Sequence, residues 1–335
     1  MRLRSAVLAA GAAAAAGAVL VGPRLIVRRL LAAEDLFADD PVAIPPDVIH
    51  HSLTMADGGE LHVVERGPRD ARPLVLLHGI TLAAEVWGYQ LRDLAPAFRV
   101  VAPDLRGHGG STAGSAGYGI GPIAGDIAAL LEQLDLRDAV IVGHSMGGMV
   151  LQRALAEHLA VLEARAAGLV FLSTTPGPPL GDTGRAAIER FAGRAAGFGS
   201  SRGWRAIRGL PPGAAGTMAT ALGFGRAPSA SHVLATERWL RAMQPESSWQ
   251  TGLTLGSHSG LAGLRSWSGP ALVLVGTRDL LTPVRFARRI AGALRDVHLE
   301  VIEGCGHMMM LERRDELDAL LRDFVARLPM RVPAP

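Results

Sequence analysis

The chain has 335 residues, of which 49% are hydrophobic and 19% charged, a balance typical of folded proteins and not of disordered ones. All 34 basic residues are arginine, yet the formal net charge is only +3, which gives no support to a nucleic-acid partner. The single cysteine, Cys305, excludes an intramolecular disulfide.

An uncharged stretch near the N-terminus, Ser5 to Gly22, consists mostly of Ala, Gly, Val and Leu and is flanked by arginines. Its length is at the lower limit for a membrane-spanning helix, so we predict an uncleaved membrane anchor within residues 1–34 and a membrane-associated protein. A signal peptide, with Arg2 and Arg4 as its basic start, is the main alternative and implies a secreted protein. An interfacial or soluble helix is the third interpretation.

After an acidic, proline-containing segment that we interpret as a linker (residues 35–48), apolar strand patterns alternate with helical ones. The predicted strands are Glu60–Glu65, Pro73–Leu77, Phe98–Ala102, Ala139–Val142, Gly168–Leu172, Pro270–Val275 and Val297–Ile302. The predicted helices are Ile120–Leu134, a helix that follows the Gly143–Gly147 turn and runs to about His158, and Asp315–Leu328. This alternation predicts an α/β fold with a doubly wound, mostly parallel sheet.

One long interval, residues 176–268, contains helical patches such as Ala186–Ala195 and Ser231–Met243 but no clear buried strand. It divides the predicted core into a first part, 49–175, and a second part, 269–329. An insertion beside strand ends is most simply a helical cap over a pocket. A flexible excursion without function is the alternative.

A serine between two glycines follows the strand at Ala139–Val142. In a very tight strand-to-helix turn, only small residues two before and two after the serine let the strand and the helix approach, and Gly143 and Gly147 supply that clearance around Ser145. The Met146 amide, at the start of the helix, then points to where an oxyanion would form. Ser145 is therefore our candidate nucleophile.

A serine hydroxyl needs an imidazole to take its proton, and the imidazole needs a carboxylate to orient it. His307 follows the last predicted strand in a glycine-containing loop, and Asp279 follows the strand before it. We predict that His307 is the general base and Asp279 the acid. The chain order serine, aspartate, histidine is the one that accompanies this type of turn.

The loop after Pro73–Leu77 is expected to supply a second oxyanion donor. Gly79 permits close backbone approach, which makes the Ile80 amide the natural partner of the Met146 amide, while His78 is expected to order the loop. The turn Asp104–Ser111 is interpreted as a loop locked by hydrogen bonds of its arginine and aspartate; a pocket wall is the alternative.

Together these motifs resemble the α/β-hydrolase family over roughly residues 49–328. The resemblance implies an eight-stranded sheet, and the string Gly-His-Ser-Met-Gly-Gly is similar to that of monoacylglycerol lipases, small esterases and cofactor-free perhydrolases. Serine at the turn argues against epoxide hydrolases and haloalkane dehalogenases, which use aspartate there. One departure is Glu312-Arg313-Arg314, where relatives often have a proline; we expect only local helix geometry to change.

We therefore expect a serine hydrolase that cleaves a carboxylic ester, lipid-like or small and apolar, without a cofactor or metal. Acyl transfer, perhydrolysis, thioester or amide cleavage and C–C bond hydrolysis use the same residues and remain open. A non-catalytic ligand-binding protein on the same fold is the alternative of another class. Cys305 and most aromatic residues are expected to pack in the core, and Met308, Met309 and Met310 are either core filler or pocket lining.

Overall fold

A computed structural model describes residues 35, 37–178, 220–221, 223–225 and 228–329. In this part of the chain, eight strands form one sheet in the order β1-β2-β4-β3-β5-β6-β7-β8. They are β1 (Ile49–Thr54), β2 (Glu60–Arg66), β3 (Pro73–Leu77), β4 (Arg99–Pro103), β5 (Ala139–His144), β6 (Ala166–Leu172), β7 (Pro270–Gly276) and β8 (Asp296–Ile302). The pairs β1–β2 and β2–β4 are antiparallel, and the others are parallel. The predicted fold class is confirmed.

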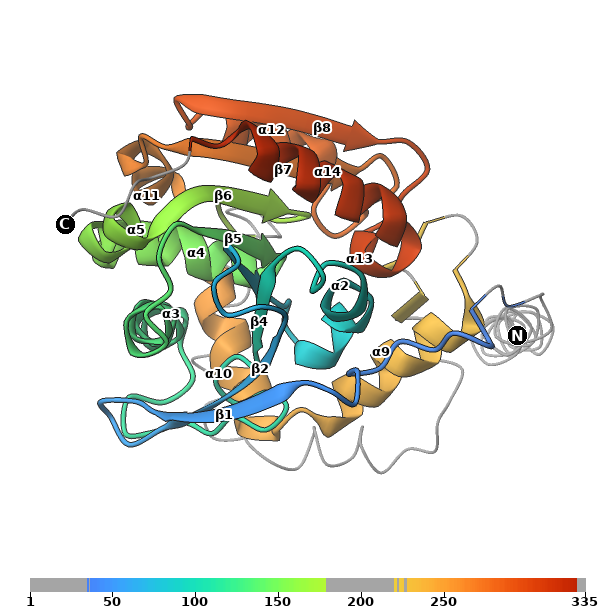
Figure 1. Cartoon of the computed structure of the whole chain (residues 1–335), viewed down its shortest axis with the longest axis horizontal. Helices are drawn as coiled ribbons and strands as arrows, with labels where there is room; N and C mark the ends of the chain where they lie inside the picture. Colours follow the sequence, from blue (N-terminus) through green and yellow to red (C-terminus); the bar gives the residue numbers. More distant parts are fainter. Residues whose placement is uncertain (1–34, 36, 179–219, 222, 226–227, 330–335) are drawn as a thin grey trace, which may run out of the picture.

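Both faces of the sheet are covered by helices. The described helices are η1 (Ala84–Trp87), α2 (Gly88–Asp93), α3 (Ile120–Gln133), α4 (Met146–Glu157), α5 (Leu159–Arg165), α9 (Ala230–Ala242), α10 (Pro245–Gly256), α11 (Leu261–Ser266), α12 (Val284–Ala291), α13 (Met309–Glu312) and α14 (Arg314–Arg327). Figure 1 shows α2 and α14 on the near side of the sheet and α4 behind it.

Each central strand contributes alternate side chains to two separate cores. In β3, Leu74 and Leu76 pack with η1, α2 and α14, while Val75 and Leu77 pack with α3 and α4. Burial on both sides explains why this strand reads as a continuous apolar run rather than an alternating one.

The order of the central strands determines where a site can form. From β3 the chain goes to β4 on one side and later to β5 on the other, so the loops that follow β3 and β5 leave the sheet in opposite directions. Ligands of open α/β sheets bind in the crevice at such a switch point, outside the carboxyl ends of the strands. Ile80 follows β3 and Ser145 follows β5 at this place.

The membrane prediction is corrected. No helix in the described ranges is long and apolar enough to cross a bilayer. The segment on which the prediction was based, residues 5–22, lies outside the described residues.

The inserted region, 176–268, is described only in part. The predicted helix Ser231–Met243 corresponds to α9 (Ala230–Ala242), and α10 and α11 follow it, whereas Ala186–Ala195 lies outside the described residues. Residues of the predicted linker contact the core: Asp40 forms ion pairs with Arg92 and Arg314 at 2.7 and 2.6 Å.

Asp318 on α14 is a buried carboxyl group that faces α2. Gln90 Nε2 donates to Asp318 Oδ1 at 3.1 Å, while Gln90 Oε1 has no partner among the described residues. Burial raises the pKa of Asp318 from 3.8 to about 6. A carboxyl group whose pKa is higher in the folded protein stabilises the fold fully only below its ordinary pKa, and this contribution is lost as the pH rises through about 6.

We expect Asp318→Asn to raise the free energy of unfolding at pH 7 by about 1–3 kcal/mol, because the neutral amide imitates the protonated acid and can donate to Gln90 Oε1. The gain should disappear near pH 4. Urea unfolding of the wild type and the variant at both pH values measures it, with exposed Asp323→Asn on the same helix as the control. An equal gain from the control variant would contradict the explanation.

Candidate active site

Ser145 lies in a strained turn between β5 and α4. Its φ is 51° and its ψ is −114°, a conformation that side-chain-bearing residues rarely adopt. A Cβ at Gly143 would lie 2.7 Å from Gly148, and a Cβ at Gly147 would lie 2.4 Å from the Leu77 carbonyl oxygen. The two glycines therefore provide the clearance that the sequence predicts. Ser145 lies directly after the carboxyl end of β5.

Asp279 and His307 form a buried pair at the ends of β7 and β8. His307 Nδ1 donates to Asp279 Oδ2 at 2.9 Å. Asp279 Oδ1 accepts hydrogen bonds from the amides of Leu281 and Thr282, and Oδ2 accepts a further one from the Thr282 hydroxyl at 2.7 Å. Burial alone would raise the pKa of Asp279, but the nearby His307 and these hydrogen bonds hold it well below its ordinary value. The carboxylate thus stays ionised and orients the imidazole.

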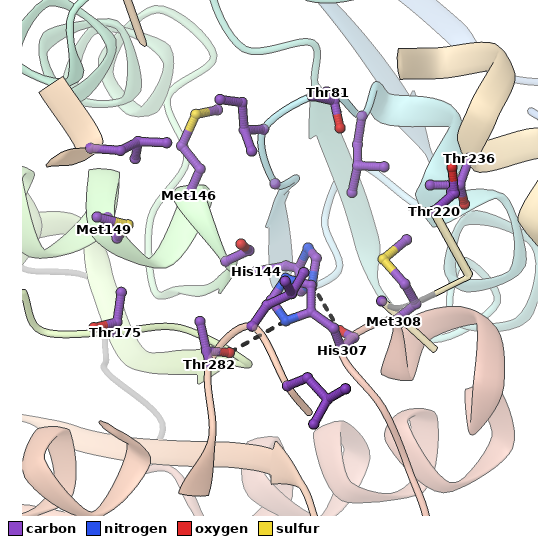
Figure 2. Close-up of a pocket in the computed structure, with 18 of the residues that line it drawn as sticks. Thr81, His144, Met146, Met149, Thr175, Thr220, Thr236, Thr282, His307 and Met308 are labelled. Atoms are coloured by element: carbon purple, nitrogen blue, oxygen red, sulfur yellow. Dashed lines mark hydrogen bonds between the residues drawn. The ribbon is translucent and has the colours of Figure 1, made fainter. Parts of the chain in front are cut away.

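Ser145 and His307 line the same cavity. Figure 2 shows His307 at its centre with a hydrogen bond toward Thr282, whose hydroxyl lies 3.3 Å from Nδ1. Because Nδ1 is occupied by Asp279, Nε2 is the ring nitrogen left for a hydroxyl partner. Within the described residues no hydrogen bond joins His307 Nε2 to Ser145 Oγ. In many catalytic sites without substrate, the distance between these two groups is long, and it shortens when the substrate binds.

The amides of Ile80 and Met146 both border the cavity. Met146 is the first residue of α4, so its amide has no acceptor within the helix. The Ile80 amide donates to no described residue. Thr81, next to Ile80, has a φ of 66°, a second strained position that the sequence analysis did not identify. Two unpaired amides beside a serine can stabilise a developing oxyanion.

Two buried histidines hold the loops around the serine. His78 Nδ1 donates to the Gly79 carbonyl oxygen at 2.7 Å, and its Nε2 accepts from the Leu105 amide at 2.9 Å, as expected for a loop-ordering residue. His144 Nε2 donates to the His307 carbonyl oxygen at 3.0 Å. Burial keeps the pKa of both rings below the usual value, so they act as neutral hydrogen-bonding groups. A Cβ at Gly79 would lie 3.0 Å from His144 Nδ1, which explains the glycine.

Glu312 has a larger structural role than the local helix change that we expected from the sequence. Its Oε1 accepts from the Met308 amide at 3.0 Å, and its Oε2 accepts from the amides of Gly306 at 3.0 Å and Gly225 at 2.6 Å. These contacts flank His307 on both sides and link its loop to the inserted region. The His307 amide adds a further link by donating to the Gly223 carbonyl oxygen at 2.7 Å.

If His307 is the general base, we expect Glu312→Gln to lower kcat about tenfold with little change in KM, because one oxygen cannot accept all three amides and a small displacement of such a base is costly. Initial rates on any turned-over substrate measure this. Glu316→Gln, at an exposed position of α14, is the control. A rise in KM at constant kcat would show instead that Glu312 shapes substrate binding.

The cavity beside Ser145 has a volume of about 790 Å³. Described residues of the inserted region contribute to its wall, while the helical cap itself stays a prediction. The lining residues are Gly79, Ile80, Thr81, Leu82, His144, Ser145, Met146, Met149, Thr175, Thr220, Gly223, Thr236, Leu240, Leu255, Leu280, Leu281, Thr282, Arg285, Phe286, His307 and Met308. The wall is mostly apolar, so it suits an aliphatic group.

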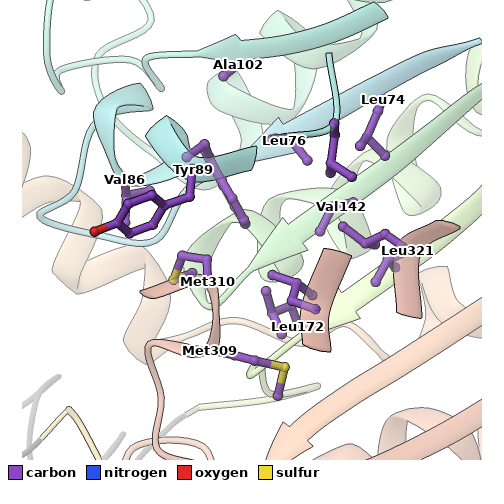
Figure 3. Close-up of a cluster of buried hydrophobic side chains, with 14 of the residues drawn as sticks. Leu74, Leu76, Val86, Tyr89, Ala102, Val142, Leu172, Met309, Met310 and Leu321 are labelled. Carbon is purple, nitrogen blue, oxygen red and sulfur yellow. The ribbon is translucent and has the colours of Figure 1, made fainter. Parts of the chain in front are cut away.

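The remaining candidates divide between the core and the cavity. Met308 lines the cavity, whereas Met309 and Met310 are buried in the core beside Leu172 and Leu321 (Figure 3). Cys305 is buried, and burial raises the pKa of its thiol, which keeps it protonated and unreactive.

The turn Asp104–Ser111 does not line the cavity. Asp104 Oδ1 accepts from the Ala84 amide at 2.7 Å, and Arg106 Nε donates to Asp126 Oδ2 at 2.8 Å. The turn is therefore a locked loop. No cluster of potential metal ligands occurs in the described part of the chain.

A mostly parallel eight-stranded sheet with a strained serine turn after a central strand defines the class of the α/β hydrolases. A family profile described as "Alpha/beta hydrolase family" matches residues 74–320. The chain belongs to the alpha/beta hydrolase family.

Individual relatives agree with this assignment. The chain is 29% identical over 290 residues to a non-heme chloroperoxidase of Burkholderia pyrrocinia, covering 82% of this chain and 98% of the relative. It is 41% identical over 126 residues to a non-heme chloroperoxidase of Streptomyces lividans, but this match covers only 37% of the chain and 45% of the relative. Among solved structures, the esterase RhEst1 from Rhodococcus sp. ECU1013 has a TM-score of 0.67 at 28% identity, covering 84% of this chain and 99% of the esterase.

Proposed function

We propose that the protein is a serine hydrolase of carboxylic esters. The observation that carries the proposal is the buried Asp279–His307 pair, joined at 2.9 Å, which shares one apolar cavity with the strained Ser145 and the amides of Ile80 and Met146. These are the groups that acyl transfer needs: a nucleophile, an oriented base and two oxyanion donors. The esterase name of the RhEst1 structure is consistent with an ester substrate.

In the proposed reaction, Ser145 Oγ attacks the ester carbonyl carbon while His307 Nε2 takes the hydroxyl proton. The carbonyl oxygen becomes negatively charged and accepts hydrogen bonds from the Ile80 and Met146 amides. The intermediate collapses, the C–O bond to the alcohol breaks, and His307 returns the proton to the leaving alcohol. Water, deprotonated by His307, then attacks the acyl-enzyme, and the carboxylic acid leaves as Ser145 regains its proton.

The cavity limits the substrate to a small or medium-sized molecule. Its volume of about 790 Å³ lies within the range of small-molecule sites, roughly 300–1,000 Å³. Met146, Met149 and Leu255 are among the apolar side chains that line it. An aliphatic acyl or alkyl group of moderate length fits such a wall.

A fluorophosphonate probe combined with a chain-length series of p-nitrophenyl and glycerol esters tests the proposal. We expect stoichiometric labelling of Ser145 in the folded protein, and hydrolysis with an optimum at short to medium acyl chains. Absence of labelling in protein that is folded by circular dichroism would overturn the proposal and favour a ligand-binding protein without turnover.

Perhydrolysis is a second candidate, supported by the names of the two chloroperoxidase relatives. Hydrogen peroxide in place of water would attack the acyl-enzyme, release a peracid and leave Ser145 free; the peracid then oxidises a halide ion. Halogenation of monochlorodimedone that requires peroxide, a carboxylic acid and Ser145 would support this activity. Halogenation independent of Ser145 would exclude it.

A further inference from the structure

Among the described residues that line the cavity, Arg285 is the arginine, and none of them is a lysine. It lies in the first turn of α12, six residues after Asp279, and its side chain is exposed. The described lining residues include no aspartate or glutamate. An arginine guanidinium carries its charge at any working pH and presents donors that match a carboxylate.

Contacts of Arg285 leave its hydrogen-bond donors available. Its guanidinium carbon lies 4.8 Å from the centre of the Phe286 ring, and Phe286 itself lines the cavity. This stacking holds the charge at the cavity wall. Within the part of the chain that the structure describes, no acidic group forms an ion pair with Arg285.

The acidic residue nearest to Arg285 in the chain is already engaged. Asp279 pairs with His307 at 2.9 Å. It offers no competing carboxylate to Arg285. Among the described residues of the cavity wall, the positive charge of Arg285 is therefore uncompensated, and an anion that reaches it needs to displace only water.

The entrance to the cavity is also apolar. Leu280 and Leu281 line the cavity and are 71% and 52% exposed, which places them on its solvent side. They lie in the short segment between Asp279 and the start of α12, the helix that carries Arg285. A ligand that contacts both leucines and the guanidinium has an aliphatic part and an anionic end.

We propose that Arg285 is a specificity-determining residue that binds a carboxylate at the far end of the substrate, so that the preferred substrates are half-esters of aliphatic dicarboxylic acids. This inference rests on the proposed ester hydrolysis, because it assigns the substrate class of that same site. The ester carbonyl lies at Ser145, the methylene chain against the apolar wall, and the free carboxylate on the guanidinium.

The test compares monoethyl esters of C4–C8 dicarboxylic acids with ethyl esters of monocarboxylic acids of the same length. We expect the wild type to favour the anionic series by about tenfold in kcat/KM. Arg285→Gln should lower kcat/KM for the anionic esters about 10- to 100-fold and for the neutral esters by less than about threefold, while Arg285→Lys restores part of the loss. Arg288→Gln, exposed on the same helix and outside the cavity wall, is the matched control.

Equal losses on both series in Arg285→Gln, or the same selective loss in Arg288→Gln, would overturn the inference. A readout without turnover separates it from the proposed function. Calorimetric titration of adipate into the Ser145→Ala protein should give binding that Arg285→Gln abolishes, while hexanol binding persists. If no ester is hydrolysed but adipate binds through Arg285, the proposed ester hydrolysis is wrong and the anion site is supported. If neutral esters are hydrolysed but adipate does not bind, ester hydrolysis is supported and the anion site is wrong.

Discussion

Replacement of Ser145 by alanine is expected to lower kcat for ester hydrolysis by about 10⁴- to 10⁶-fold and to abolish covalent labelling by a fluorophosphonate. Alanine removes the hydroxyl that we propose as the nucleophile but keeps the Cβ, so the turn with its φ of 51° should persist. The measurement is the burst and steady-state release of p-nitrophenol at saturating substrate. KM should stay within a fewfold, because the apolar wall and the oxyanion amides remain.

Ser173→Ala is the matched control for this variant. Ser173 follows β6 as Ser145 follows β5, is buried and has a positive φ of 45°, but it does not line the cavity. Its replacement should leave kcat and labelling unchanged. The double variant Ser145→Ala/His307→Ala should be no slower than Ser145→Ala, since the two residues act as one unit. More than a tenth of the wild-type kcat in Ser145→Ala would contradict a serine mechanism.

The second large effect is expected at Asp279. Asp279→Asn should lower kcat by about 10³- to 10⁴-fold, because an amide in place of Oδ2 can turn its NH₂ toward His307 Nδ1 and stabilise the wrong tautomer. The pKa of Asp279 is held well below its ordinary value, so the carboxylate also stabilises the fold at neutral pH. That stabilisation is present above the ordinary pKa of 3.8 and is lost as the pH falls below it. Asp279→Asn should therefore be less stable than the wild type at pH 7, with a smaller difference near pH 2.

Thr282→Val separates the charge of Asp279 from its surroundings. The Thr282 hydroxyl donates to Asp279 Oδ2 at 2.7 Å and lies 3.3 Å from His307 Nδ1, so the valine removes both contacts and keeps the carboxylate. We expect a loss in kcat of about tenfold or less. Equal losses in Thr282→Val and Asp279→Asn would mean that loop geometry, and not the charge, dominates. Steady-state kinetics and urea unfolding at both pH values provide the comparison.

The sheet could be predicted from the sequence wherever a strand is buried on both faces. Pro73–Leu77 and Pro270–Val275 are unbroken apolar runs, and β3 and β7 occupy these positions almost to the residue. Strand β1 was not predicted because Ile49–Thr54 is an exposed edge strand with two histidines. Its sequence therefore contains too few apolar residues to show a strand pattern. Helix α12 was also missed: an eight-residue helix with three arginines resembles a loop in composition.

The predicted site residues converge at one edge of the sheet because each follows a parallel strand. Such residues are recognisable from sequence, since the strand and its terminal glycines are local signals. Glu312 is different: its partner Gly225 lies 87 positions earlier in the chain, and nothing near Glu312 indicates that its carboxylate will accept amides from both sides of His307. Contacts of this kind depend on how distant loops meet, which the periodicity of the chain does not encode.

The hydrogen bonds that anchor the His307 loop determine which segments of two family members can be exchanged in a chimera. Gly223 accepts from the His307 amide and Gly225 donates to Glu312, so these glycines of the inserted region hold the backbone of the loop that carries His307, the proposed base. A chimera that exchanges residues 176–268 as a block would replace that scaffolding together with the substrate-facing wall. Transplants that retain 223–225 from the recipient should keep its turnover rate, whereas full-length transplants should exchange substrate preference and lose catalytic efficiency together.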